Sequence, residues 1–322
     1  MELIRGSHNL RARHRGCVAT IGNFDGVHRG HHAVIERVRE RAGALELPAM
    51  VITFEPHPLE YFAPEHAHRR ISALRDKVDA LAACGVDRVL CLRFGRQLAE
   101  MPAESFVDSL LVERLGVRFL MVGDDFRFGC GRRGDFTLLQ QAGGRHGFEV
   151  ARMPTVVVDG ERVSSTRVRA ALAAGELDVA EALLGRPYAI SGRVARGDAI
   201  GRELGWRTAN LRFRRTPPPV HGIFAVTVEG LGGERQGVAS VGTRPTINGR
   251  ATLLETHLFD FDENIYGAHI RVTFRAFLRG EKRFDSMDEL RAQIGRDADA
   301  ARQWFARNDP DKPTTGDRRK TS

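Results

Sequence analysis

The stretch CVATIGNFDGVHRGH, residues 17–31, decides the fold of the first half of the chain. Its apolar beginning is typical of a β-strand that enters a glycine-rich turn, and the pattern over residues 30–42 is typical of a helix. Three glycines allow tight turns and close approach of a ligand: Gly22, Gly26 and Gly30. The order strand, turn, helix indicates a parallel α/β unit whose helix N-terminus faces an anion.

The rest of the first half repeats this alternation. Short apolar runs predict strands at 49–54, 87–94 and 117–123, and helical patterns lie at 71–84 and 103–115. Strands and helices that alternate at this spacing predict a parallel sheet covered on both faces. We therefore expect a first domain of α/β class, residues 1–184, that binds its ligand at the carboxyl ends of the strands.

After about residue 184 the pattern changes to short, turn-rich strands without crossover helices. Glycine and proline mark the junction in LGRPYAISGRV, residues 184–194. We expect a small antiparallel β-barrel over residues 185–307, closed by a terminal helix that Ser286 and Glu289 begin as a capping box. The polar tail, residues 308–322, is expected to be disordered.

The composition excludes several classes of protein. The 322 residues are 42% hydrophobic and 28% charged, as in soluble globular proteins. No run approaches the roughly 18 apolar residues of a membrane helix, and the basic N-terminus lacks the apolar segment of a secretory signal, so we expect a cytoplasmic protein without membrane contact. The four cysteines form no CxxC pair, which argues against a disulfide framework or a zinc site.

The net charge of +8 suits either nucleic acid or small anionic substrates. The arginines are dispersed rather than gathered in blocks, so we favour small substrates. A basic RNA-binding or regulatory protein is the alternative from another functional class. The oligomeric state stays open between a monomer and a transient oligomer.

His28 and His31 lie three residues apart, which places them on one face of the first helical turn. Two imidazoles beside a helix N-terminus can donate hydrogen bonds to phosphate and to the charge that grows during phosphoryl transfer. The alternatives are a helix cap or a metal site, although no nearby acid completes a metal site. The segment SSTRVR, residues 164–169, places hydroxyls and arginines at a helix start, which favours a second anion contact over a plain helix cap.

Four segments together resemble a known family: GNFDGVHRGH, FEPHP (54–58), VGDDFRFG (122–129) and SSTRVR. They resemble the adenylyltransferase module of the bacterial bifunctional riboflavin kinase/FAD synthetases, which has a Rossmann-like nucleotidyltransferase core. The resemblance covers nearly the whole chain. It implies that the phosphate of FMN attacks the α-phosphorus of ATP, which yields FAD and pyrophosphate.

The resemblance also assigns residues to this module, with His28 and His31 acting on the transferred phosphate. ATP would be held by Gly22, Asn23, Phe24, Asp25, Gly26, Gly30, Ser164, Ser165, Thr166 and Arg167. The flavin would lie against Phe62, Asp125, Phe126 and Phe128, although each of these aromatic side chains could equally belong to the core. No lysine lies in these motifs, so histidine, arginine and Mg²⁺ are expected to supply the positive charge.

The barrel half resembles the riboflavin kinase module, which phosphorylates riboflavin with ATP. The usual Pro-Thr-Ala-Asn of that module is Arg207-Thr208-Ala209-Asn210 here, so Thr208 and Asn210 remain as oxygen ligands for Mg²⁺. Glu255, in an apolar strand, would be the general base that takes the proton of the ribityl 5′-hydroxyl. ATP in this module would contact Gly192, Arg193, Gly197, Gly201, Thr208, Asn210 and Arg244.

Two further alternatives concern the enzyme class. Because Arg207 replaces a proline, the kinase loop loses rigidity, and only the adenylyltransferase site could be active. A related adenylyltransferase that acts on a pantetheine or nicotinamide substrate would not need the attached barrel.

Overall fold

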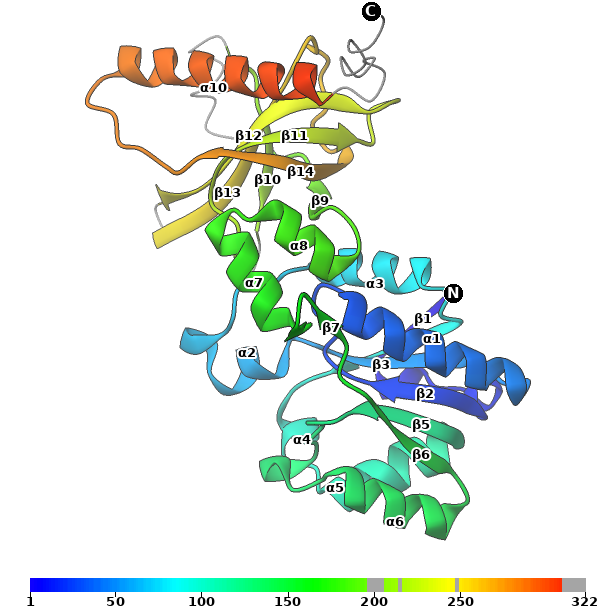
Figure 1. Ribbon diagram of the computed structural model, residues 1–322. Helices are drawn as coiled ribbons and strands as arrows, with labels where there is room; N and C mark the ends of the chain where they lie inside the picture. The colour runs from blue at the N-terminus through cyan, green and yellow to red at the C-terminus, as the bar shows by residue number, and fades with distance from the viewer. Residues whose placement is uncertain (196–205, 214–215, 247–248, 309–322) are drawn as a thin grey trace, which may run out of the picture. The chain divides into compact units, whose positions relative to one another are not determined.

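The computed structural model describes residues 1–195, 206–213, 216–246 and 249–308, without the side chains of residues 66, 244–246 and 249–251 (Figure 1). The chain divides into two compact units. The first holds residues 1–171 and 179–186, and the second holds residues 172–178 and everything from Pro187 onward. The change of unit after Arg186 lies two residues beyond the boundary proposed from the sequence. The tail expected to be disordered lies, from residue 309, outside the described residues.

The first unit is built on a six-stranded parallel sheet in the order β1-β4-β3-β2-β5-β6, which confirms the expected α/β class. The strands are β1 (Glu2–Arg5), β2 (Cys17–Ile21), β3 (Ala49–Glu55), β4 (Arg88–Arg93), β5 (Val117–Gly123) and β6 (Glu149–Met153). The sequence did not predict β1 and β6. Both are short edge strands, and their side chains are mostly exposed or half-buried, so neither carries the apolar run of a central strand.

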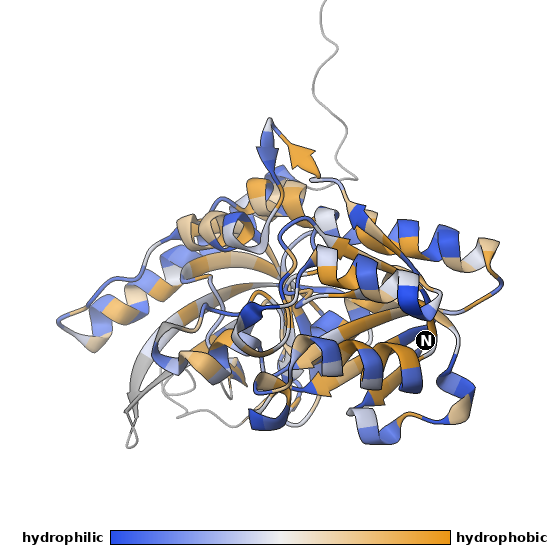
Figure 2. Cartoon of the chain, turned by 90° about the horizontal axis from the view of Figure 1, so that it is seen from below, coloured by the Kyte–Doolittle hydropathy of each residue, from blue (hydrophilic) through white to orange (hydrophobic). Residues whose placement is uncertain are grey.

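Helices cover both faces of this sheet (Figure 1). They are α1 (Arg29–Ala44), α2 (Pro58–Phe62), α3 (Leu74–Ala83), α4 (Arg96–Ala99), α5 (Ala103–Ser105), the π-helix η4 (Phe106–Arg114) and α6 (Phe136–His146), with 3₁₀ turns η1 (Ser7–Asn9), η2 (Ala12–His14), η3 (Pro64–His66) and η5 (Cys130–Arg132). Apolar residues of α1 and α3 pack on one face, and those of η4 and α6 pack on the other. Figure 2 shows the strands hydrophobic over most of their length and the helices alternating between the two colours, as half-exposed helices do.

Two predicted helices differ from the observed ones. The first begins at Leu74 rather than at residue 71, and ahead of it the backbone N–H groups of Ile71 and Ser72 donate to the Asp25 carboxylate. The second, predicted over 103–115, is one turn of α5 followed by a π-helix, whose wider turn points Phe106 and Leu110 into the core.

A small hairpin and two helices follow β6. The hairpin joins β7 (Val157–Val158) to β8 (Glu161–Arg162) through Asp159 and Gly160, which both have positive φ, 54° and 78°. This is the backbone that two-residue hairpin turns require. Helices α7 (Ser165–Ala174) and α8 (Leu177–Leu184) come next.

The second unit is a six-stranded antiparallel sheet in the order β10-β13-β12-β11-β14-β9. Its strands are β9 (Ala189–Arg193), β10 (Ala209–Arg212), β11 (Gly222–Glu229), β12 (Arg235–Thr246), β13 (Gly249–Leu258) and β14 (His269–Arg279). A single bridge, Ala195 to Asn210, joins the two edges, so the barrel is nearly closed. Helix α10 (Met287–Arg307) packs on it, and the Ser286 hydroxyl accepts the Glu289 N–H at 3.2 Å. The predicted barrel with its capped terminal helix is confirmed.

Candidate functional sites

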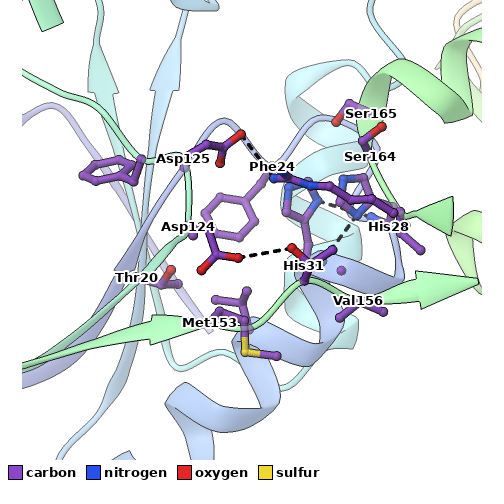
Figure 3. A pocket seen from close by; sticks show the side chains of 18 of the residues that line it. Thr20, Phe24, His28, His31, Asp124, Asp125, Met153, Val156, Ser164 and Ser165 are labelled. Carbon is purple, nitrogen blue, oxygen red and sulfur yellow. Dashed lines mark hydrogen bonds and ion pairs between the residues drawn. The ribbon is translucent and has the colours of Figure 1, made fainter. Parts of the chain in front are cut away.

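The pocket of the first unit lies at the carboxyl ends of β2, β5 and β6 (Figure 3). The chain passes from β2 to β3 on one side of β2, whereas β5 lies beside β2 on its other side. The strand order therefore reverses at β2, and ligands of open parallel sheets bind where this reversal occurs. The wall comes from the β2–α1 turn and from three further segments: Gly123–Phe126, Met153–Val156 and Arg162–Ser165. We call it the first-unit pocket.

His28 and His31 line this pocket as a stacked pair, with ring centroids 3.7 Å apart. His28 is the N-cap of α1: its Nδ1 accepts the His31 N–H at 3.4 Å, and the His31 Nδ1 accepts the His28 N–H at 3.3 Å. Because both Nδ1 atoms accept, each neutral ring carries its proton on Nε2. The reciprocal cap therefore leaves two Nε2–H donors for a ligand.

Burial keeps both rings neutral. It lowers the pKa of His28 from 6.5 to about 4, and the nearby His32 lowers that pKa further. Burial also holds the pKa of His31 well below its usual value, and the neighbouring His28 acts in the same direction. At neutral pH both imidazoles can thus donate a hydrogen bond without carrying a charge.

The residues predicted to bind ATP in the β2–α1 turn divide into two groups. Gly22, Phe24 and Gly30 line the first-unit pocket together with the two histidines. Asn23, Asp25 and Gly26 shape the turn instead. The buried Asp25 carboxylate accepts the N–H groups of residues 71 and 72 and pairs with Arg169 at 2.6 Å.

The SST segment also divides. Ser164 and Ser165 line the first-unit pocket on the side of His28, whereas Thr166 is exposed and does not line it (Figure 3). The Arg167 guanidinium lies outside the pocket as well: it donates to the carbonyl oxygens of Val158 and Glu161 and pairs with the Glu161 carboxylate at 3.1 Å. Arg167 thus holds the β7–β8 hairpin.

The side chain that this hairpin brings to the pocket is Arg162, which pairs with Asp125 at 3.2 Å. On the same side Thr155 donates a hydrogen bond to Asp124 at 3.1 Å. Sequence reasoning missed these contacts because the hairpin lies outside every quoted motif and its position depends on Arg167.

The four residues predicted to hold the flavin do not lie together. Asp125 and Phe126 line the first-unit pocket. Phe128 is buried behind it, with its ring stacked on Phe126 at 5.5 Å. Phe62 is 63% exposed and packs against Tyr61 and Phe94 rather than against the pocket.

Two cations that the motifs did not include contact the β2–α1 turn. The Lys77 Nζ donates to the Asn23 carbonyl oxygen at 2.7 Å, and Arg186 donates to those of Gly26 and Val27 at 2.7 and 2.9 Å. The quoted motifs hold no lysine, but Lys77 of α3 contacts the backbone of the turn. A sequence signal existed, because Lys77 follows Leu74 by three residues and so shares the apolar face of α3.

In the second unit, one pocket is lined by β10 residues and by the segment after β13. We call it the Asn210 pocket. Its lining includes Thr208, Asn210, Thr256 and the segment Phe261–Tyr266. Gly192 lies on β9 and Arg193 donates to the Gly267 carbonyl oxygen, and neither lines the pocket. Gly197, Gly201 and the side chain of Arg244 are outside the described residues.

Two buried oxygen atoms of the Asn210 pocket, Asn210 Oδ1 and Thr256 Oγ1, have no hydrogen-bond partner among the residues that the structure describes. The Asn210 Nδ2 donates to the Thr208 carbonyl oxygen at 3.2 Å, which leaves Oδ1 available. Buried oxygens without a partner are rare and suit a hard cation such as Mg²⁺. In the described part of the chain, no group of three or more His, Cys, Asp or Glu residues could hold a metal ion. A cation here would meet the neutral oxygens of Asn210 and Thr256, and Asp262 and Glu263 also line the pocket.

A second pocket, the Glu255 pocket, lies between the barrel and α10. Asn210 and Glu255 are opposite one another on the paired strands β10 and β13, and Thr208 lines both pockets. Leu253 and His257 are half-buried like Glu255, whereas Leu254 and Thr256 are buried, as expected for alternate residues of a strand. The pocket has apolar walls from Trp206, Ile223, Val238, Phe284, Leu290 and Ile294, and charged groups at Arg279, Glu281, Lys282 and Asp297.

Arg207, which stands where the related module has proline, is fixed by two contacts. Its guanidinium donates to the Asp262 carbonyl oxygen at 2.6 Å, and its own carbonyl oxygen contacts the Nδ1 of His257 at 2.9 Å. Trp206 packs edge-on against His257, with centroids 4.7 Å apart. These contacts hold Arg207 in place without a proline ring.

Comparisons with known proteins agree with this division. A family model described as FAD synthetase matches residues 10–167, and one described as riboflavin kinase matches residues 184–305. Proteins named bifunctional riboflavin kinase/FMN adenylyltransferase are similar over almost their whole length. The one from Escherichia coli K12 is 53% identical over 312 residues, covering 96% of this chain and 100% of the relative. The one from Pseudomonas fluorescens is 51% identical over 307 residues, covering 95% and 98%.

A solved structure from Streptococcus pneumoniae has the same fold, with a TM-score of 0.79 and 29% identity, and it covers 94% of this chain and 100% of that one. That protein is described as a macrolide-efflux protein. Among the described residues of this chain, no helix is long and apolar enough to cross a membrane.

Proposed function

Since the chain belongs to the family of bifunctional riboflavin kinase/FMN adenylyltransferases, we propose that it phosphorylates riboflavin with ATP and then joins the FMN product to AMP from a second ATP. One observation supports both steps: each unit holds a pocket with groups suited to phosphate chemistry. These groups are His28 and His31 in the first unit and Asn210 and Glu255 in the second.

In the adenylyl step, an oxygen of the FMN phosphate attacks the α-phosphorus of ATP, the bond to the β-phosphate breaks, and pyrophosphate leaves. No side-chain nucleophile takes part. The two Nε2–H groups of His28 and His31 donate to the phosphate oxygens on which charge develops, and Ser164 and Ser165 line the pocket beside His28. Because the donors are held by their own backbone contacts, they need no reorganisation during the reaction.

The first-unit pocket offers the FMN ring an aromatic wall at Phe126, which Phe128 supports from behind. Asp125 supplies a polar anchor and is now paired with Arg162. We place the isoalloxazine there rather than against Phe62, because Phe62 faces other aromatic side chains.

In the kinase step, the riboflavin 5′-hydroxyl attacks the γ-phosphorus of ATP and ADP leaves. We assign ATP to the Asn210 pocket and riboflavin to the Glu255 pocket, whose apolar walls suit a flat ring and whose charged groups suit its polar edge. Glu255 lines the Glu255 pocket opposite Asn210 on the paired strand, and there it takes the hydroxyl proton during attack.

Mg²⁺ would be held by Asn210 Oδ1 and the Thr208 hydroxyl, and it would neutralise charge on the ATP phosphates. The protein's contribution to cation binding is to hold the Asn210 and Thr208 oxygens in fixed positions. The proposal needs neither nucleic acid nor a membrane, and it places both reactions in the cytoplasm.

The test is a chromatogram of the purified protein with riboflavin, ATP and Mg²⁺, in which FMN and then FAD should form. His28→Ala should lower FAD formation from supplied FMN by roughly 100-fold or more, because it removes a donor to the developing charge. Riboflavin phosphorylation should stay within twofold. Glu255→Ala should give the reverse pattern.

The two variants serve as controls for each other. Loss of both activities in one variant at unchanged secondary structure would contradict the division of labour between the units. FAD formation from supplied FMN without FMN formation in the wild type would leave only the adenylyltransferase active.

A further inference from the structure

The turn from Asn23 to Val27 is anchored at every carbonyl oxygen. Asn23 O accepts from Lys77 and, at 3.2 Å, from the Thr53 hydroxyl. Asp25 O accepts from the Ser165 hydroxyl at 3.0 Å, and the last two carbonyls of the turn accept from Arg186. Phe24 O takes a weak bond of 3.4 Å from the Val27 N–H. All of these carbonyls except that of Phe24 are thus bound by side chains of other segments.

The backbone N–H groups of the same turn are less occupied. Within the described part of the chain, those of Asn23, Phe24 and Asp25 find no acceptor, whereas the Gly26 N–H donates to the Ser72 hydroxyl at 3.1 Å. Successive backbone N–H groups that are available in this way can bind an anion.

The backbone of this turn is unfavourable by itself. Phe24, Gly26 and Val27 have φ of 48°, 84° and 42°, and only the glycine adopts such values easily. A β-branched residue such as Val27 persists there only when its surroundings fix it. Arg186 supplies such a contact, because it binds the carbonyl oxygens of Gly26 and Val27.

Two of the anchors are cations, and their places in the chain differ. Lys77 is buried, with 4% of its surface exposed, and reaches the turn from α3. Arg186 is half-buried and is the last residue of the first unit, directly before the chain enters the second. Neither lines the first-unit pocket.

We propose that Lys77 and Arg186 are positioning residues for adenylyl transfer: they hold the carbonyls of Asn23, Gly26 and Val27 so that the turn presents its N–H groups and His28 to the ATP phosphates. This inference rests on the proposed function of the first-unit pocket. It predicts an effect on ATP in that reaction alone, because the flavin wall at Phe126 and the second-unit pockets do not depend on these contacts.

The test uses the full chain with FMN and ATP, without riboflavin, and follows pyrophosphate release. In Arg186→Gln and Lys77→Met, the KM for ATP should rise roughly tenfold, while the KM for FMN stays within twofold. Arg186→Lys should recover part of the loss, since one ammonium can reach one of the two carbonyls. Riboflavin phosphorylation by the same preparations should stay within twofold.

Matched controls remove an exposed cation from α3, the helix that carries Lys77, and from α1, the helix that follows the turn. Arg37→Gln on α1 and Arg75→Met on α3 each break only a surface ion pair and should leave the KM for ATP unchanged.

A purely structural role of Lys77 and Arg186 would lower the apparent kcat, because less enzyme is folded, and would leave the KM values for ATP and FMN unchanged. That result overturns the inference. An unchanged KM for ATP in Arg186→Gln also overturns the inference. This variant decides the matter even if Lys77→Met does not fold. A wild type that makes no FAD from FMN refutes the proposed function instead.

Discussion

Acidification should weaken the first unit through His28. The pKa of His28 is lowered from 6.5 to about 4, mainly by burial, so the unfolded chain binds a proton at this residue more readily than the folded chain. The resulting stability is fully present above pH 6.5 and is lost as the pH falls toward 4. Between pH 7.5 and pH 5.0 these two pKa values correspond to a loss of about 2 kcal/mol from this one side chain.

The variant that tests this is His28→Gln, which keeps a polar side chain at the N-cap but cannot titrate. Its free energy of unfolding should fall by about 2 kcal/mol less than that of the wild type between the two pH values. Hydrogen exchange of the amides in β2 and α1, measured at increasing urea concentration, reports the free energy of unfolding of the first unit. Both tryptophans, Trp206 and Trp304, lie in the second unit, so their fluorescence is an internal control that should not distinguish the two proteins. An equal pH dependence in wild type and variant would refute the assignment of a buried neutral imidazole.

Two other changes are informative. Asn210→Leu removes the buried Oδ1 that has no hydrogen-bond partner among the described residues, so FMN formation should fall by roughly 100-fold. The free energy of unfolding should change by less than about 1 kcal/mol. FAD formation from supplied FMN is the control and should be unchanged. Gly143→Ala places a methyl 2.4 Å from the Phe148 carbonyl oxygen and should destabilise the first unit by about 1–3 kcal/mol. The neighbouring Gly144→Ala meets nothing within 4 Å and should stabilise α6 by about 0.5–1 kcal/mol, so a calorimetric scan that gives both variants the same sign would contradict this packing.

Local patterns predicted the features that depend on nearby residues. The strand at 17–21, helix α1 and the capped start of α10 at Ser286 are set by periodicity and by contacts three or four residues apart. The pairing of His28 with His31 is of this kind. A turn of helix brings the two rings together wherever the rest of the chain lies.

Side chains that act across segments were predicted less well. Arg167 follows two pocket-lining serines closely, yet it contacts the β7–β8 hairpin, and Arg162 reaches the first-unit pocket in its place. Phe62 follows a quoted motif by four residues but packs against Phe94. Neither outcome can be inferred from spacing, because each depends on where a separate segment returns.

The sequence by itself determined the class of each unit, the glycine-rich turn and its two histidines, because hydrophobic periodicity and short-range hydrogen bonds act within a few residues. Only the tertiary structure decided which cations anchor that turn and that Asn210 lies opposite Glu255. Lys77 and Arg186 come from α3 and from the end of the first unit, and the facing pair depends on the register of β10 against β13. Contacts of this kind follow from the packing of the whole sheet, which no local pattern records.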